Sequence, residues 1–126
     1  MNAPLIARLV AAGRICFGLA MMSSPSRVTG RWLGRDAGGA GTRVVTRCLG
    51  ARDLALGVGA LAAAESQLRP WVAAGIVADT ADLVATATGG ESLPLAGRLL
   101  TGALASGGAA LGVMSLAGLR PPAPGS

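Results

Sequence analysis

Five charged side chains stand within otherwise apolar stretches of this sequence, and their types and spacing could do chemistry. They are two arginines and three aspartates: Arg14, Arg52, Asp53, Asp79 and Asp82. Asp79 and Asp82 share one face of a helix through their i, i+3 spacing. Such charges could pair with one another and fix the packing of helices. They could also form a site for an ion, a proton or a small polar ligand.

The positions of these charges relative to the expected helix ends place them at matching depths. Arg52 lies as far before the turn that joins its helix to the next as Asp82 lies after it. By the same counting, Arg14 and Asp53 are nearly level. We therefore expect one buried layer with a formal charge of −1, in which Arg52 pairs with Asp82 and has Asp79 within reach.

The composition excludes several kinds of active site. The chain has no His, Lys or Tyr, so it cannot form a His-based triad, a Schiff-base lysine or a P-loop. Its two cysteines, Cys16 and Cys48, cannot make a four-thiolate zinc site. We expect buried free thiols, with a disulfide between them as the alternative. Asp79 and Asp82 lack a second acidic cluster that would complete a Mg²⁺ site, so we expect a protein that is not an enzyme and has no metal or cofactor.

The charges interrupt four apolar segments that predict membrane-spanning helices. The chain is 52% hydrophobic and only 13% charged, with a mean hydropathy of +0.57. The clearest segment, 99–119, carries no charge and can cross a hydrocarbon core of about 30 Å. We predict an all-α fold, a single domain over 1–119, in which four transmembrane helices form an up-down antiparallel bundle. The expected helices cover about 4–22, 43–64, 70–88 and 94–119, and a flexible tail covers 120–126.

Two alternatives compete with this topology. A soluble helical bundle would need polar outer faces, but 54–64 contains only Leu, Ala, Gly and Val. A cleaved signal peptide is the alternative for the first segment, although no clear cleavage site follows 15–22. The connection 23–42 is expected to be a loop with a short interfacial piece at 28–33, which places Trp32 at the level of the headgroups.

The basic charge of the chain indicates membrane boundaries rather than nucleic-acid binding. The net charge is +5 and the pI about 11.3, but the arginines are spread singly and three aromatic residues cannot form a stacking surface. Arginines in short loops favour the cytoplasmic side, and they place both termini outside the cytoplasm. The side that holds the first and third connections between helices carries five arginines: Arg27, Arg31, Arg35, Arg43 and Arg98. The side of the termini carries three: Arg8, Arg69 and Arg120.

Small residues supply the expected contacts between helices. The chain has 26 Ala and 20 Gly, and in lipid small residues let helix backbones approach closely. One stripe of small residues is Ala51, Ala55, Gly59 and Ala63, and the fourth segment contains a GxxxG motif at 108–112. We expect Gly57, Gly59, Gly108 and Gly112 to pack helices of one chain together, with a homodimer as the alternative.

Two short motifs carry a resemblance to a known family. The Gly-Ala-Arg-Asp sequence at 50–53 and the Asp-x-x-Asp sequence at 79–82, with Arg14 and Gly18 in the first helix, resemble a group of short actinobacterial four-helix membrane proteins. These proteins are catalogued as a domain of unknown function. The resemblance covers the chain to about Leu119. It implies the four-helix topology and a joint role for the charges of the two motifs, and it implies no activity.

Two functions are compatible with these features. We expect a small multi-pass protein of a bacterial cell membrane, without catalytic activity, whose buried Arg/Asp layer fixes helix packing or assembly with a partner. Its partners would be the lipid bilayer and either further copies of the chain or another membrane protein, with no nucleic acid. The alternative is a small transporter or permeation element that uses the same layer. A water-accessible cavity reaching Asp79 would favour transport, and a dry, paired cluster would favour a scaffold.

Overall fold

The computed structural model describes residues 2–89 and 93–119, which are helical almost throughout. Within these residues, four long helices are present: α1 (Ala3–Ser23), α3 (Ala40–Ala62), α4 (Leu68–Thr88) and α5 (Leu95–Gly118). A shorter helix and two 3-10 segments connect them: α2 (Pro25–Leu33), η1 (Gly34–Gly38) and η2 (Glu65–Gln67). The described residues contain no strand, so the predicted all-α class is confirmed.

The four long helices lie on the four segments predicted from the sequence. The largest difference is at the start of α3, which begins at Ala40 rather than at 43. The predicted tail, 120–126, lies outside the described residues. Apolar length and the positions of prolines and charges were therefore sufficient to locate these helices.

The expectation of a loop over 23–42 is wrong for most of its length, because α2 and η1 occupy it. Pro25 stands in the first turn of α2, where its fixed φ favours a helix and its missing N–H is not needed. Gly34 ends this helix with a φ of 60°, which glycine adopts without strain. Trp32 is partly buried, and its backbone lies against Gly97 near the start of α5, so it does not project outward as an interfacial anchor.

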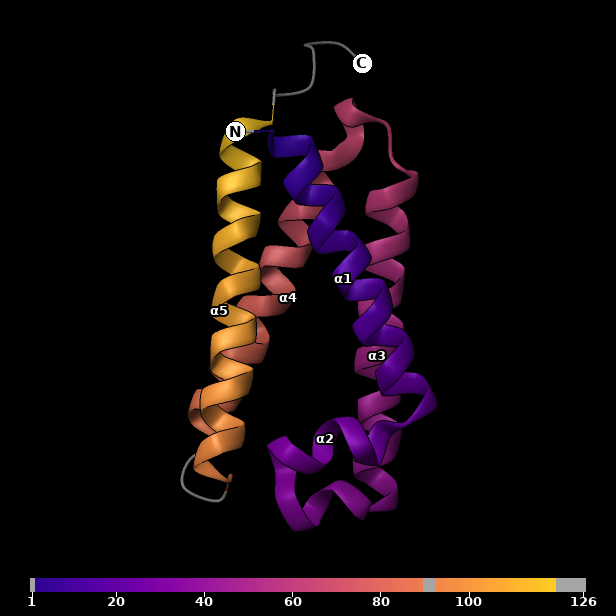
Figure 1. The fold of residues 1–126 in the computed structure, drawn as a ribbon, viewed down its shortest axis with the longest axis vertical. Helices are drawn as coiled ribbons and strands as arrows, with labels where there is room; N and C mark the ends of the chain where they lie inside the picture. Colours follow the sequence, from indigo (N-terminus) through magenta and orange to yellow (C-terminus); the bar gives the residue numbers. More distant parts are fainter. Residues whose placement is uncertain (1, 90–92, 120–126) are drawn as a thin grey trace.

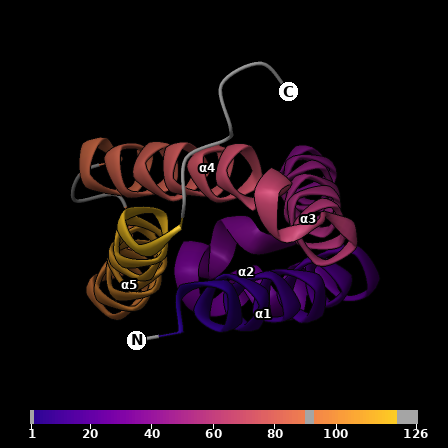
Figure 2. The same cartoon turned by 90° about the horizontal axis from the view of Figure 1, so that it is seen from above.

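The four long helices form two closely packed pairs, α1 with α3 and α4 with α5. They run alternately up and down (Figure 1), and seen from above their order around the molecule is α1, α3, α4, α5 (Figure 2). The pairs meet at the end that holds the connection between α3 and α4, and they separate toward the end where α2 lies (Figure 1). Contacts between the pairs are sparser than contacts within them. Side chains that reach from one pair to the other are therefore needed to join the pairs where they separate.

The interior of the protein is built mainly from small side chains. The apolar cluster between the helices contains Ala3, Ala7, Ala11, Ala60, Ala63, Leu68, Val72 and Leu119. Large apolar side chains instead point outward from all four long helices, for example Leu9 (63% exposed), Val45 (59%), Val77 (68%) and Leu99 (65%). A protein that folds in water buries most of its large apolar residues and keeps charged ones outside. Here many large apolar side chains are exposed, and two aspartates, Asp53 and Asp79, are buried.

Two helices, α1 and α5, are long and apolar enough to cross a membrane. A core helix of a soluble protein can meet the same criterion, but such a helix is mostly buried. Only 22% of the apolar window of α1 and 17% of that of α5 are buried. By length, composition and low burial, α1 and α5 are therefore candidate membrane spans, although a signal sequence near the N-terminus would pass the same test of length and composition as α1.

Glycines permit the closest approach between α1 and α3. A Cβ atom at Gly50 would lie 2.7 Å from the carbonyl oxygen of Gly18, and a Cβ at Gly18 would lie 2.6 Å from that of Gly50. Gly57 faces the carbonyl oxygen of Ala11 in the same way, at 2.6 Å. Backbone atoms cannot rotate away from a side chain, so a larger residue at these positions would separate the helices.

The four glycines predicted to pack helices all lie at contacts between helices of this chain. Besides Gly57 with Ala11, the contacts are Gly59 with the ring of Trp71, Gly108 with Asp79, and Gly112 with Ile76. The position of each glycine is therefore explained by packing within one chain, without a second copy.

The expected stripe of small residues on α3 lies at helix contacts only in its second half, where Gly59 faces Trp71 and Ala63 is buried. Ala51 and Ala55 are exposed, whereas Gly50, Asp53 and Gly57 are buried. The prediction is wrong for Ala51 and Ala55, because spacing by four does not show which side of a helix faces inward. The buried face contains Asp53, whose carboxylate has its partners in the interior.

Candidate functional site

The five charged residues singled out from the sequence lie together in one continuous ion-pair network. Arg14 of α1 contacts Asp53 of α3 (Nη1–Oδ1, 3.2 Å) and Asp79 of α4 (Nη2–Oδ2, 2.7 Å). Arg52 of α3 contacts Asp53 (Nη2–Oδ1, 3.0 Å) and Asp82 of α4 (Nη2–Oδ2, 2.7 Å). Asp53 accepts hydrogen bonds from both arginines, so it joins the two halves of the network.

The pair between Arg52 and Asp82 is bidentate. Arg52 Nη1 donates to Asp82 Oδ1 at 2.9 Å, and Nη2 donates to Oδ2 at 2.7 Å. Two parallel bonds to a carboxylate fix the orientation of both side chains as well as their distance. This pair therefore links α3 to α4 in a defined register.

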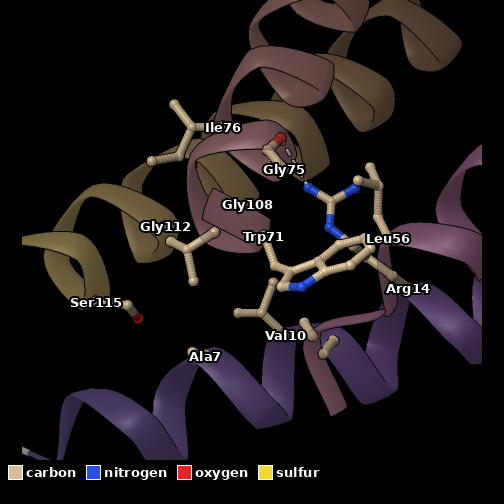
Figure 3. Close-up of a pocket in the computed structure, with 13 residues that line it drawn as sticks. Ala7, Val10, Arg14, Leu56, Trp71, Gly75, Ile76, Gly108, Gly112 and Ser115 are labelled. Atoms are coloured by element: carbon tan, nitrogen blue, oxygen red, sulfur yellow. Dashed lines mark hydrogen bonds between the residues drawn. The ribbon is translucent and has the colours of Figure 1, made fainter. Parts of the chain in front are cut away.

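Two glycines make room for the more buried half of the network, and Figure 3 shows one of them, Gly75, beside the guanidinium of Arg14. Arg14 Nη2 donates to the carbonyl oxygen of Gly75 at 2.9 Å, and a Cβ at Gly75 would lie 3.1 Å from the same nitrogen. A Cβ at Gly108 would lie 2.5 Å from Asp79 Oδ2, the oxygen that accepts from Arg14. Side chains at these two positions would therefore crowd the ion pair.

The two ends of the network differ in exposure. The side chains of Arg14, Asp53 and Asp79 are 12%, 10% and 12% exposed. Those of Arg52 and Asp82 are 30% and 29% exposed. The centre of the network is thus Arg14 with its two carboxylates, and Arg52 with Asp82 is its outer end.

Most of the expected pairings agree with the observed contacts, and one differs. Arg52 contacts Asp82, and Arg14 contacts Asp53, as the comparison of depths predicts. Asp79 contacts Arg14 rather than Arg52. Depth along a helix does not give direction around it, and Asp79 points toward α1, where Arg14 is available.

A cavity of about 410 Å³ lies next to the network. All five charged residues line it, and the rest of its wall comes mainly from apolar side chains of α1, α2 and α5, among them Phe17, Trp32, Leu100 and Leu104. The indole Nε1 of Trp32 is buried and has no hydrogen-bond partner among the described residues. The network is therefore paired and also lines a cavity, so it meets both of the criteria that distinguished a scaffold from a transport site.

A second, smaller cavity lies toward the end where the helix pairs meet (Figure 3). Its volume is about 30 Å³, and Ala7, Trp71 and Ser115 are among the residues that line it. A space of this size can hold a water molecule when polar partners are available. The hydroxyl of Ser115 is fully buried and lacks a partner within the described part of the chain, so it provides one such group.

Three arginines outside the network have a role that the sequence did not show. Each donates to carbonyl oxygens at the C-terminal end of a neighbouring helix, where carbonyls lack partners within their own helix. The bonds run from Arg8 to Leu61 and Ala63 (2.8 and 3.2 Å), from Arg47 to Met22 (3.3 Å), and from Arg69 to Leu116 and Leu119 (2.9 and 2.7 Å). The signal available in the sequence is an arginine that lies level with the end of an antiparallel neighbour.

Cys16 and Cys48 are free, and both are exposed, so the expectation of buried thiols is wrong. Each is on the outward face of its helix, which the sequence pattern did not reveal. Among the described residues, no group of three or more His, Cys, Asp or Glu side chains is arranged to hold a metal ion.

The fold and the network define an all-helical protein with an internal Arg/Asp cluster. Comparisons of the chain with protein-family models, with curated proteins and with solved structures found no match. The contacts, burial and charges described above are therefore the basis for inferring function.

Proposed function

We propose that this protein is a four-pass integral membrane protein in which the Arg/Asp network clamps two helix pairs together. The network carries this proposal, because it connects α1, α3 and α4 where direct contacts between the pairs are sparse. Ion pairs between helices replace the hydrophobic driving force that is absent in lipid. The clamp is structural, and we assign it no catalytic step.

The distribution of apolar side chains supports membrane crossings by α3 and α4 as well. Val45 and Val58 of α3 and Val77 and Val84 of α4 are each about half exposed or more, at 59%, 49%, 68% and 55%. Four charged residues of the same two helices, Arg52, Asp53, Asp79 and Asp82, point into the network, while Arg43, Arg47 and Arg69 lie nearer the helix ends. A lipid-facing helix shows this arrangement, with apolar groups outside and polar groups inside the bundle.

The first segment belongs to the folded protein in this proposal and is not a removed signal. Arg14 supplies the central cation of the network, and Gly18 packs against Gly50. Loss of α1 would leave Asp79 without its arginine. We also propose, from its Gly-Ala-Arg-Asp and Asp-x-x-Asp motifs, that the chain belongs with short actinobacterial four-helix membrane proteins.

Membrane association can be tested by fractionation. Membranes of cells that express the full chain should retain the protein through washing with alkaline carbonate, because α5 alone is long and apolar enough for stable insertion. A peripheral membrane protein, released by the same wash, serves as the control. Recovery of a folded, detergent-free monomer from the soluble fraction would contradict the proposal.

A second function, transport or permeation of a small polar ligand, is supported by the cavity of about 410 Å³ that reaches Asp79. A site for a carried ligand has to bring buried polar groups into contact with accessible space. The cavity brings all five charged residues of the network to accessible space.

A further inference from the structure

We propose that the large cavity binds an amphipathic organic cation, a quaternary ammonium or protonated amine with an apolar body. This inference rests on the second function proposed above and names the class of its ligand. Three features carry it: the charge of the lining, the free carboxylate oxygens and the composition of the apolar part of the lining.

The charged lining has one carboxylate more than it has cations. Three aspartates and two arginines give a formal charge of −1, and all five line the cavity. Both guanidinium groups are already engaged by carboxylates. An anionic ligand would therefore meet an excess of negative charge, whereas a monovalent cation would neutralise it.

Two buried carboxylates in this lining retain unused acceptors. Over the whole residue, main chain included, Asp53 is 7% exposed and Asp79 is 9% exposed. Within the described part of the chain, every hydrogen bond to Asp53 ends on Oδ1, and the bond to Asp79 ends on Oδ2. Asp53 Oδ2 and Asp79 Oδ1 therefore accept no hydrogen bond there, and their negative charge can attract a cationic headgroup electrostatically.

The apolar part of the cavity lining suits a ligand with an apolar body rather than a hydrated ion or a metal ion. Phe17 and Trp32 supply aromatic rings, and Leu100 and Leu104 supply aliphatic surface. Aromatic faces attract organic cations, and a volume of about 410 Å³ is in the range of small-molecule sites. A metal ion would need several more oxygen ligands, which these side chains do not offer.

Binding can be measured by equilibrium dialysis of benzyltrimethylammonium against the full-length protein in phosphatidylcholine nanodiscs. We expect saturable binding with one site per chain, above the background of empty nanodiscs. The anion 3-phenylpropionate, of similar size and opposite charge, should not bind. Asp79→Asn and Asp53→Asn should each weaken binding by at least about tenfold, because each removes a charged partner of the ligand.

A second pair of variants tests the cavity without changing any charge. Gly13 lines the cavity and Gly107 does not, and a Cβ at either position would meet nothing within 4 Å. Gly13→Phe should fill part of the cavity and weaken binding by at least about tenfold, whereas Gly107→Phe should leave it unchanged. Glu65→Gln, at an exposed position in η2, controls for loss of any carboxylate.

Several outcomes would overturn the inference. These are the absence of saturable binding to the wild type, equal binding by Gly13→Phe and Gly107→Phe, or stronger binding of the anion. A lipid that copurifies at one per chain with the wild type, but not with Gly13→Phe, would assign the cavity to lipid instead. If protein that resists carbonate extraction fails to bind the cation, this inference is wrong while the membrane proposal stands. If the aspartate variants do not fold but Gly13→Phe and Gly107→Phe do, the comparison of cation binding by these two glycine variants still tests the inference.

Discussion

Arg14 holds the most demanding position among the charged residues. It is largely buried, and it neutralises carboxylates from two other helices while donating to the backbone of Gly75. Arg52 also has two carboxylate partners, but its side chain and that of Asp82 are close to one-third exposed. A buried charge that loses its partner costs far more than one that solvent can reach, so the two arginines should differ in importance.

We expect Arg14→Met to destabilise the protein more than Arg52→Met. The first change leaves Asp79 buried without a cation, for which a loss of about 3–5 kcal/mol is typical. The second change leaves Asp82, whose side chain is 29% exposed, and Asp53 keeps Arg14. Unfolding of the purified variants in mixed micelles by increasing SDS measures the difference. Arg43→Met, at an exposed position, is the control, and equal losses for Arg14→Met and Arg52→Met would contradict this ranking.

The sequence located the charged residues well and their directions less well. Charges are rare in membrane helices, so the type and depth of each residue were enough to place five of them in one layer. Which carboxylate meets which arginine depends on rotation about each helix axis, and this is set by packing contacts such as Gly50 with Gly18 between α3 and α1, and Gly112 with Ile76 between α5 and α4. Asp79 therefore has Arg14 as its partner, which the count of residues from the turns did not indicate.

Contacts between helix backbones determine how α1 and α3 pack. Gly18 and Gly50 lie opposite each other, and each would place a Cβ within 2.7 Å of the other's carbonyl oxygen. A larger residue at either position would require the two helices to move apart, and this movement would also separate Arg14 from Asp53. Small residues at this crossing therefore support the ion pairs indirectly.

We expect Gly50→Ala to lower stability by about 1–3 kcal/mol, the usual cost of overpacking a tight contact. Its Cβ would meet both the carbonyl oxygen of Gly18 and the Cβ of Met21. Gly107→Ala should be neutral or stabilising by up to about 1 kcal/mol, because a Cβ there meets nothing and Ala favours a helix. Thermal melts in detergent compare the two variants. If both behave alike, glycine at this crossing serves no packing purpose.

Helix α2 is the element that sequence patterns missed. The surrounding stretch is rich in Gly, Ser and Arg, which is typical of a loop, and the helix has only nine residues. It is held by tertiary contacts, because the backbone of Trp32 lies against Gly97 of α5. Tertiary packing stabilises short helices that would not form alone, and the sequence does not show that α5 will be adjacent.

The molecule as a whole consists of two close helix pairs that diverge toward the end where α2 lies (Figure 1). Composition and apolar length were enough to predict an all-helical protein with four long helices. The cavity could not be predicted, because it depends on how far the pairs separate. That separation follows from contacts at one end, such as Gly59 with Trp71, and from the position of α2 at the other.

The two ends of the molecule differ in their available positive charge. The end near α2 carries Arg27, Arg31, Arg35, Arg43 and Arg98. At the opposite end, Arg8 and Arg69 donate to the last carbonyls of α3 and α5, and Arg120 lies outside the described residues. An excess of arginine favours the cytoplasmic side, so the end near α2 should face the cytoplasm.

A reporter that is active only in the cytoplasm can test both the orientation and the number of crossings. The start of α1 and the end of α5 are adjacent, since a Cβ at Gly118 would lie 2.7 Å from that of Ala3. Termini on one side would follow from four crossings, and equally from two crossings by α1 and α5 alone. The connection between α3 and α4, which contains Ser66, separates these cases. It lies on the side of the termini if all four helices cross, and on the side of Gly39 if only two do.

We therefore expect a signal from an insertion at Gly39 and none from an insertion at Ser66 or a fusion after Ser126. A reporter that is active only outside the cytoplasm should give the complementary pattern and shows that each fusion is expressed. Signal at both Gly39 and Ser66 would reduce the crossings to α1 and α5. The charges of α3 and α4 would then lie at the membrane surface, where ion pairs add little stability, and the clamp would lose its physical basis. Signal after Ser126 and at Ser66, but not at Gly39, would keep four crossings and reverse the orientation.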